Sequence, residues 1–123
     1  MSSDAAALEV VREVCATFPE TSERLSHGSP TFFIRDKNTF ANVHADHHGD
    51  GRTAIWFAAP PGVQEQLVDD EPERYFRPPY VGHRGWVGLR ADIDRDDDEI
   101  AAVLREAYLH IAPKTLAKQL LGE

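Results

Sequence analysis

Residues 30–59 read PTFFIRDKNTFANVHADHHGDGRTAIWFAA, and the fold class that we predict rests on this segment. It contains three short runs rich in β-branched and aromatic residues, at positions 31–35, 39–45 and 53–58. Polar residues at 36–38 and a glycine-containing group at 48–51 separate the runs, as turns separate neighbouring strands. The segment therefore predicts an antiparallel meander.

Helical patterns lie on both sides of this meander. Apolar residues recur at helical spacing over residues 4–18, up to a proline. After the Pro-Pro-Gly sequence at 60–62 we expect a short helix around residues 63–67. Residues 94–111 combine an acidic start with an apolar stripe, and leucines at 116–121 predict a last short helix. Helices are thus expected at both ends of the chain.

One more strand is expected over residues 85–93, where two sets of side chains alternate. The resulting prediction is an α+β fold, in which an antiparallel sheet carries the N- and C-terminal helices on one face, within a single domain over residues 1–123. The set facing the core would be Val87, Leu89, Ala91 and Ile93, and the other sheet face would present Trp56, Trp86 and Arg90 to solvent as a binding surface.

The composition restricts the classes of function. The 13 basic residues against 21 acidic ones give a net charge of −8, which disfavours coating nucleic acid or an anionic membrane through the overall field. We find neither a secretion signal nor a membrane-spanning run, so a cytoplasmic location without membrane contact is expected. Cys15 is the only cysteine and falls in the first helical stripe, which indicates core packing and excludes a cysteine-cluster zinc site.

Positive charge is concentrated in residues 74–91, which contain four arginines and no carboxylate. Arginine donates to phosphate in bidentate fashion, and neighbouring aromatic rings can stack on bases, so this segment suggests a surface for nucleic acid or a small anion. Salt bridges from Arg74 and Arg77 to the acidic residues 69–73 are the alternative. The proposed anion-binding residues are Arg35, Lys37, Arg77, Tyr80, His83, Arg84, Trp86 and Arg90.

Two arrangements of these residues would favour different partners. A continuous positive ridge through Arg35, Lys37, Arg77, Arg84 and Arg90 would favour DNA. A concave pocket around His83 and Arg84 would favour a small anionic ligand, and a protein partner is a third possibility. The oligomeric state is left open by the sequence.

Metal and enzyme chemistry are weaker alternatives. His44, Asp46, His47, His48 and Asp50 include metal-ligating types, although a solvated hairpin turn explains them as well, and the aspartates at 92–98 fit a helix start. The enzyme alternative is proton transfer by His83, paired with Tyr80 or Arg84, and no recognisable nucleophile accompanies it. Ser26 and Ser29 lie near His27, but proximity in sequence does not establish a triad. We expect no catalytic residue, no metal and no cofactor.

Six short segments, in order, match the pattern of one protein family. They are FPE at 18–20, HGSPTF at 27–32, Lys37 followed by FA at 40–41, YVGHRGWV at 80–87, AY at 107–108 and APK at 112–114. In this order they resemble the MmcQ/YjbR family of small bacterial proteins over nearly the whole chain. The resemblance implies a fold similar to that of frataxin-like CyaY proteins and DNA binding through a double-wing motif. DNA is therefore the expected partner, with a small anionic ligand or a protein as the alternative.

Overall fold

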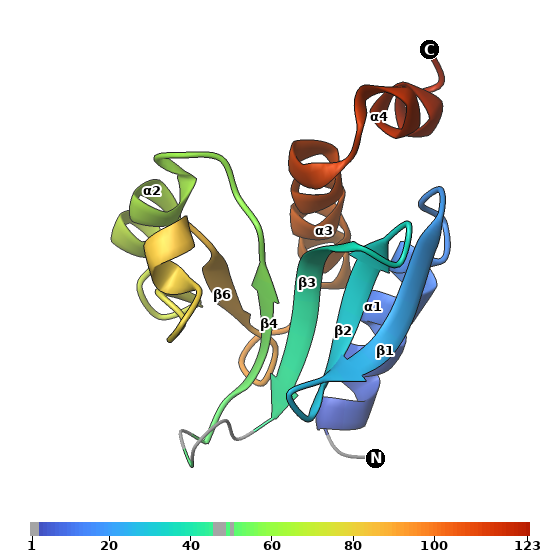
Figure 1. The fold of residues 1–123 in the computed structure, drawn as a ribbon. Coiled ribbons are helices and arrows are strands. Elements are labelled where there is room, and N and C mark those ends of the chain that lie inside the picture. The colour runs from blue at the N-terminus through green and yellow to red at the C-terminus, as the bar shows by residue number, and fades with distance from the viewer. Residues whose placement is uncertain (1–2, 46–48, 50) are drawn as a thin grey trace.

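The computed structural model describes residues 3–45, 49 and 51–123 and shows an α+β fold (Figure 1). Helices and strands follow one another in the predicted order, with two additional strands. The α-helices are α1 (Ser3–Cys15), α2 (Val63–Asp70), α3 (Asp97–Ile111) and α4 (Lys114–Leu121). A short 3-10 helix, η2 (Gly82–Arg84), precedes the last strand. The strands are β1 (Thr21–Ser26), β2 (Ser29–Ile34), β3 (Asn38–Ala45), β4 (Thr53–Phe57), β5 (Tyr75–Phe76) and β6 (Val87–Arg90).

The six strands form one antiparallel sheet in the order β1-β2-β3-β4-β6-β5. The predicted meander is confirmed as β2, β3 and β4. The edge strands β1 and β5 were not predicted: β1 is the polar sequence TSERLS and β5 has only two residues, so neither carries an apolar alternation. Edge strands tolerate such sequences because one side of each has no strand partner.

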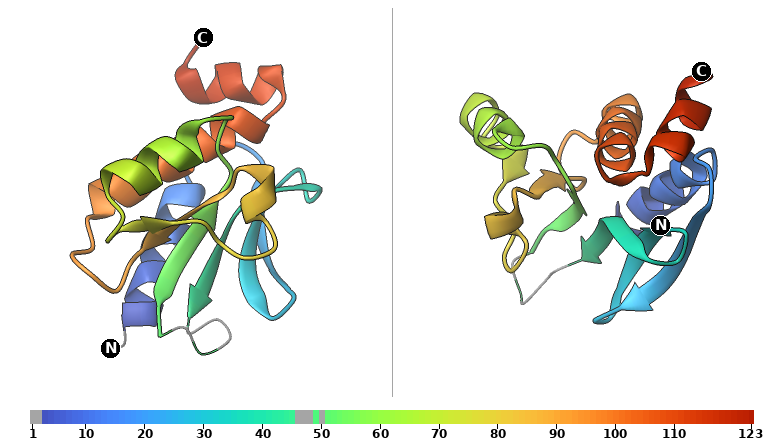
Figure 2. Two further views of the ribbon diagram at one scale, coloured as in Figure 1. Left: turned by 90° about the vertical axis from the view of Figure 1, so that its left-hand side faces the viewer. Right: turned by 45° about the horizontal axis from the view of Figure 1, so that its top comes forward.

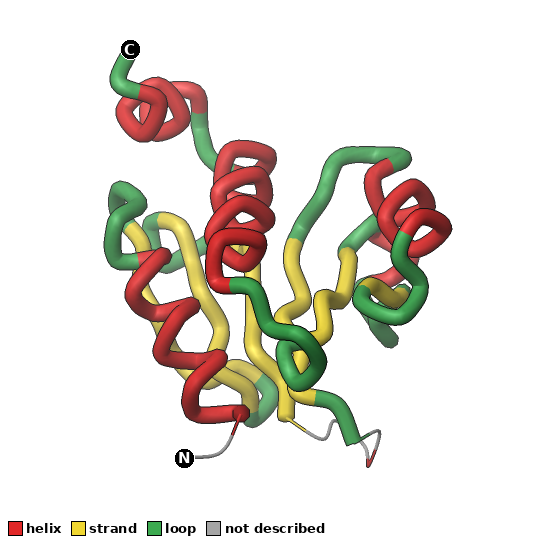
Figure 3. Tube along the Cα trace, turned by 180° about the vertical axis from the view of Figure 1, so that it is seen from behind, coloured by secondary structure: helices red, strands yellow, loops and turns green. Residues whose placement is uncertain are grey.

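Helices α1 and α3 cover one face of the sheet, as expected (Figure 3). An aromatic cluster of Phe18, Phe40 and Tyr108 joins them to the sheet, with ring centroids 5.0 to 6.3 Å apart. The Tyr108 hydroxyl donates to the Pro19 carbonyl at 2.7 Å, so this buried phenol is hydrogen-bonded. Asp96 caps α3 by accepting from two backbone amides, which confirms the acidic helix start.

The last predicted strand is shorter than expected. Val87, Leu89 and Ala91 are buried as predicted, but Ile93 is 37% exposed, so its placement in the core was wrong. The reason is that β6 ends at Arg90, after which the chain bends away from the sheet toward α3.

The predicted surface of exposed tryptophans is also wrong. Trp56 and Trp86 are each only 3% exposed. Residues 77–86, between β5 and β6, cross over the sheet face that α1 and α3 leave uncovered (Figure 2). Helix α2 packs beside the edge strand β5. The second sheet face is therefore partly covered by a loop, and the space between loop and sheet is available for a pocket.

None of the helices within the described residues is both long and apolar enough to cross a membrane.

Candidate ligand-binding pocket

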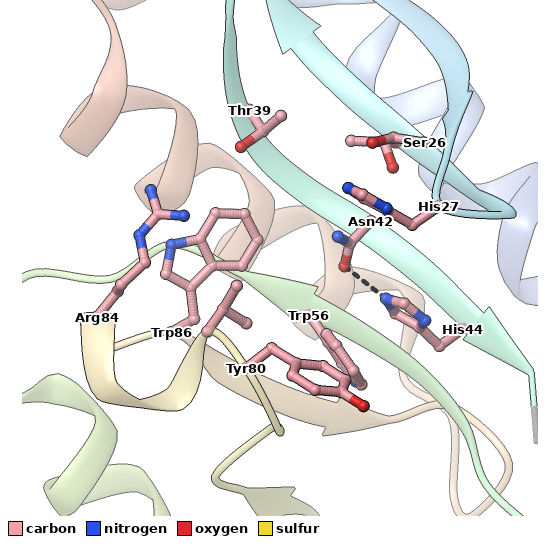
Figure 4. Close-up of a pocket in the computed structure, with 11 residues that line it drawn as sticks. Ser26, His27, Thr39, Asn42, His44, Trp56, Tyr80, Arg84 and Trp86 are labelled. Atoms are coloured by element: carbon pink, nitrogen blue, oxygen red, sulfur yellow. Dashed lines mark hydrogen bonds between the residues drawn. The ribbon is translucent and has the colours of Figure 1, made fainter. Parts of the chain in front are cut away.

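A pocket of about 580 Å³ lies between the sheet and the segment 77–86. We call it the aromatic pocket. Strands β1 to β4 supply one side, with Ser26 and His27 at the end of β1, and the segment 77–86 supplies the other (Figure 4). Its lining includes Trp56 and Trp86, the two tryptophans of the chain.

The strand register explains how the sheet side of the pocket forms. Thr31 lies opposite Asn42, Asn42 lies opposite Trp56, and Trp56 lies opposite Gly88, so these residues make one row across β2, β3, β4 and β6. Directly opposed residues in antiparallel strands point to the same face of a sheet. At the end of the row the Phe76 ring lies over Gly88, where an added Cβ would come within 2.4 Å of Phe76 Cζ. The row is thus a preformed floor.

His44 extends the aromatic floor. Its ring stacks on Trp56 with centroids 3.6 Å apart. Its Nε2 lies 3.0 Å from Asn42 Oδ1, and its Nδ1 lies 3.1 Å from Ser29 Oγ. An amide oxygen only accepts hydrogen bonds, so Nε2–H of His44 donates to Asn42 Oδ1. The contacts with Asn42 and Ser29 together hold the imidazole in one orientation beside Trp56.

The segment 77–86 supplies the opposite wall. Tyr80 is 69% exposed and extends toward Trp56 across the pocket (Figure 4). Arg84 lies at one end, with its guanidinium carbon 5.7 Å from the centroid of the Trp86 ring, within the range of a cation–π contact. The pocket therefore combines flat aromatic surfaces with one permanent positive charge at its rim.

Gln64 of α2 holds this wall in place. Its side chain is only 5% exposed, and Nε2 donates to the carbonyls of Gly82 at 2.8 Å and Trp86 at 2.6 Å. A buried amide with both N–H groups used fixes the two ends of the turn that carries His83 and Arg84. The sequence gives no sign of this role, because glutamine in a helix is usually exposed.

Three of the proposed anion-binding residues line the aromatic pocket, namely Tyr80, Arg84 and Trp86. Arg77 and His83, again with Arg84, line a neighbouring pocket that satisfies the expectation of a concavity around His83 and Arg84. The structure brings these five residues together.

The other three proposed residues lie apart from both pockets. Arg35 pairs with Glu20 at 3.2 Å, and Arg90 pairs with Asp92 at 2.9 Å. Lys37 is exposed in the turn between β2 and β3. Two of the five cations expected in a ridge are thus neutralised by adjacent carboxylates. The expected pairing of Arg74 with residues 69–73 is wrong as well, because Arg74 pairs with Glu99 at the start of α3.

The remaining sequence expectations concern metal binding and the single cysteine. Asp46, His47, His48 and Asp50 lie outside the described residues, and within the described ones no group of three or more His, Cys, Asp or Glu is placed to hold a metal ion. Cys15 is buried as predicted, and burial raises the pKa of its thiol to about 12. A thiol with this pKa is not a nucleophile at neutral pH.

Sequence reasoning missed much of the aromatic pocket. It treated His44 as a metal ligand or as a polar residue of a solvated turn, it placed Trp56 in solvent, and it gave Thr31, Asn42 and Gln64 no role in a site. The alternation of side chains within β3 and β4 could have indicated the residues of the pocket floor. It identifies them only when the cross-strand partners are known.

Comparison with known proteins identifies the relatives of this chain. A family model named YjbR matches residues 16–110. The crystal structure of Deinococcus radiodurans protein DR2400, which carries a DUF419 domain, superposes with a TM-score of 0.72 at 17% sequence identity, covering 92% of this chain and 86% of that one. Among curated proteins, none matches this sequence significantly. The family match spans most of the chain, and the chain belongs to the YjbR family.

Proposed function

We propose that this member of the YjbR family binds a small planar molecule that carries an anionic group. One observation supports the proposal above all others: a single pocket combines the stacked pair His44 and Trp56, the rings of Tyr80 and Trp86, and the guanidinium of Arg84. The planar part of the ligand would lie against the aromatic rings, and its anionic group would face Arg84.

The size and chemistry of the pocket fit this class of ligand. Its volume of about 580 Å³ falls within the range of roughly 300 to 1,000 Å³ that small-molecule sites occupy. Such sites are mainly apolar and contain a few polar groups that orient the ligand. Asn42 and Arg84 supply polar groups on two sides, and a guanidinium suits a carboxylate or phosphate because its N–H groups donate in parallel.

DNA binding, which the resemblance to MmcQ/YjbR proteins implies, is the second candidate. Arg77 and Arg84 favour it, because neither belongs to the salt bridges found among the described residues, and exposed rings such as Tyr80 can stack on unpaired bases. The net charge of −8 and the ion-paired Arg35 and Arg90 weigh against a surface that follows a phosphate backbone. The small ligand is therefore the better-supported candidate.

Tryptophan fluorescence tests the proposal directly. The chain has two tryptophans and both line the aromatic pocket, so their emission reports on occupancy. Matched anionic and neutral probes, benzoate against benzamide and AMP against adenosine, would be titrated into the protein. We expect a saturable change for at least one anionic probe. Its affinity should fall about tenfold in Arg84→Gln, the loss of about 1.4 kcal/mol that one charge-assisted hydrogen bond supplies.

The control is Arg105→Gln, which removes an exposed arginine of α3 that lines neither this pocket nor its neighbour. It should bind the probes as the unchanged protein does. Saturable binding of neither an anionic nor a neutral probe would refute the proposal. Binding of short DNA with a negative dependence of log affinity on log salt, reduced by Arg77→Gln and Arg84→Gln, would favour DNA instead.

A further inference from the structure

A second pocket, of about 430 Å³, adjoins the aromatic pocket and shares Arg84 with it. We call it the cationic pocket. The segment around η2 contributes Arg77, His83 and Arg84 to its lining, and α3 contributes His110. Residues that are far apart in sequence therefore direct two guanidinium groups and two imidazoles toward one concavity.

The backbone around this pocket is held firmly. Arg77 lies directly across Gly82, since an added Cβ on that glycine would come within 2.7 Å of Arg77 Cγ and 3.0 Å of its Nε. The carbonyl oxygen of the same Gly82 accepts a hydrogen bond from the buried Gln64 side chain, which also donates to the Trp86 carbonyl. The side chain of Arg77 thus packs against a turn that Gln64 of α2 holds.

The charges around the pocket favour an anion. Arg77 and Arg84 bring two permanent positive charges, whereas Glu65 is the single carboxylate in the lining. Helix α2 begins beside the pocket at Gly62, which lines it and provides no side-chain cap. The N-terminal end of a helix carries partial positive charge and adds to the attraction for an anion. The local balance is positive in a chain whose net charge is −8.

We infer that the cationic pocket binds a phosphate-class oxyanion. Guanidinium groups bind phosphate oxygens in bidentate fashion, and two of them lining one concavity suit a group with several oxygens. The volume of about 430 Å³ falls within the range of roughly 300 to 1,000 Å³ that small-molecule sites occupy, so the pocket has room for more than a single phosphate. A diphosphate or a phosphate joined to a larger group is therefore the expected class.

This inference does not depend on the ligand of the aromatic pocket, although Arg84 lines both pockets. The shared arginine means that one ligand, with a planar ring in the aromatic pocket and a phosphate in the cationic pocket, would contact Arg84 from both. Arg77 separates the two sites experimentally, because it lines only the cationic pocket.

Calorimetric titration of the full chain with sodium pyrophosphate tests the inference, with inorganic phosphate as the smaller probe and sodium chloride at matched ionic strength as the blank. We expect saturable binding of pyrophosphate, tighter than that of phosphate. Arg77→Gln should weaken it by about tenfold or more, Arg77→Lys by less, and the matched Arg105→Gln should leave it unchanged.

Thermal unfolding checks that each variant folds, and His83→Gln provides a second probe of the same lining should Arg77→Gln be unstable. Absence of saturable heat up to about 10 mM pyrophosphate at low salt would overturn the inference. Equal losses of pyrophosphate affinity in Arg77→Gln and Arg105→Gln would overturn the inference too. That result would show that the anion responds only to the net charge of the protein and not to a specific site. Because the aromatic probes are read by tryptophan emission, their failure would leave the pyrophosphate result intact, and the reverse also holds.

Discussion

Replacement of Gln64 by leucine should loosen the turn on which both pockets depend. The change removes two hydrogen bonds, to the carbonyls of Gly82 and Trp86, while keeping a side chain of similar size. Gly82 keeps an acceptor role toward the Gly85 amide at 3.0 Å, so the Trp86 carbonyl bears most of the loss. Two hydrogen bonds contribute about 1 kcal/mol each, and a buried unpaired carbonyl adds part of its desolvation penalty. The free energy of unfolding should therefore fall by about 2 to 3 kcal/mol.

This loss converts into a measurable shift of the melting temperature. For 123 residues at about 2.1 cal/mol/K each, the unfolding entropy is about 0.26 kcal/mol/K, so the melting temperature should fall by about 8 to 12 °C. Circular dichroism would follow the transition, and tryptophan emission should shift to the red in the folded variant because Trp86 lies at the released end of the turn. Gln64→Glu, of the same shape, should be at least as damaging, since it sets a carboxylate against two carbonyl oxygens.

The matched control is Gln66→Leu, two residues further along the same helix and exposed. It should change the melting temperature by no more than about 2 °C, as surface substitutions usually do. If Gln64→Leu melts within about 2 °C of Gln66→Leu, the two hydrogen bonds do not hold the turn and the argument for preformed pockets is refuted.

Three further predictions concern individual side chains. Burial raises the pKa of the Cys15 thiol to about 12, so in the native protein it should not react with a thiol-specific disulfide reagent at about pH 8. It should react fully in urea, and a rapid reaction in the native protein would contradict the burial. The hydrogen bonds from Arg90 lower the pKa of the Asp92 carboxyl, so its stabilising effect is present above the ordinary carboxyl pKa and lost as pH falls through the lowered folded value. Asp92→Asn should cost about 1 kcal/mol in urea unfolding at neutral pH, and this cost should shrink as pH falls below the ordinary carboxyl range; a cost that does not change in acid would show that the charge is irrelevant. Gly88→Ala should destabilise by about 1 to 3 kcal/mol because the new Cβ would enter the Phe76 ring, and a neutral effect would mean that the ring moves freely.

The strands and helices with strong local patterns were predictable from the sequence. Residues 39–45 alternate and contain β-branched and aromatic residues, and they form β3 over Asn38–Ala45. The acidic start and apolar stripe of residues 94–111 became α3 with Asp96 as its cap. The polar edge strand β1 and the two-residue β5 escaped prediction, because their hydrogen bonds to β2 and β6 define them as strands and their own side chains do not.

The candidate site was predictable only in part. The segment containing Tyr80, Arg84 and Trp86 was recognised from its arginines and aromatic rings, and it does line the pockets. The sequence did not predict which arginines remain unpaired and so able to bind an anion. Arg35 and Arg90 form salt bridges with Glu20 and Asp92, and these contacts depend on how the chain turns.

The sequence by itself determined the order of the helices and of the strands β2, β3, β4 and β6, the α+β class, and the clustering of arginine with aromatic residues between β5 and β6. These features depend on local composition and on periods of two and 3.6 residues. The tertiary structure alone decided that this segment folds back over the sheet, so that Trp56 and Trp86 line a pocket instead of a surface. The physical reason is that the pocket is lined by side chains from separate strands and loops. Their relative positions are set by the sheet register and by buried hydrogen bonds such as those of Gln64, and no local sequence pattern encodes either.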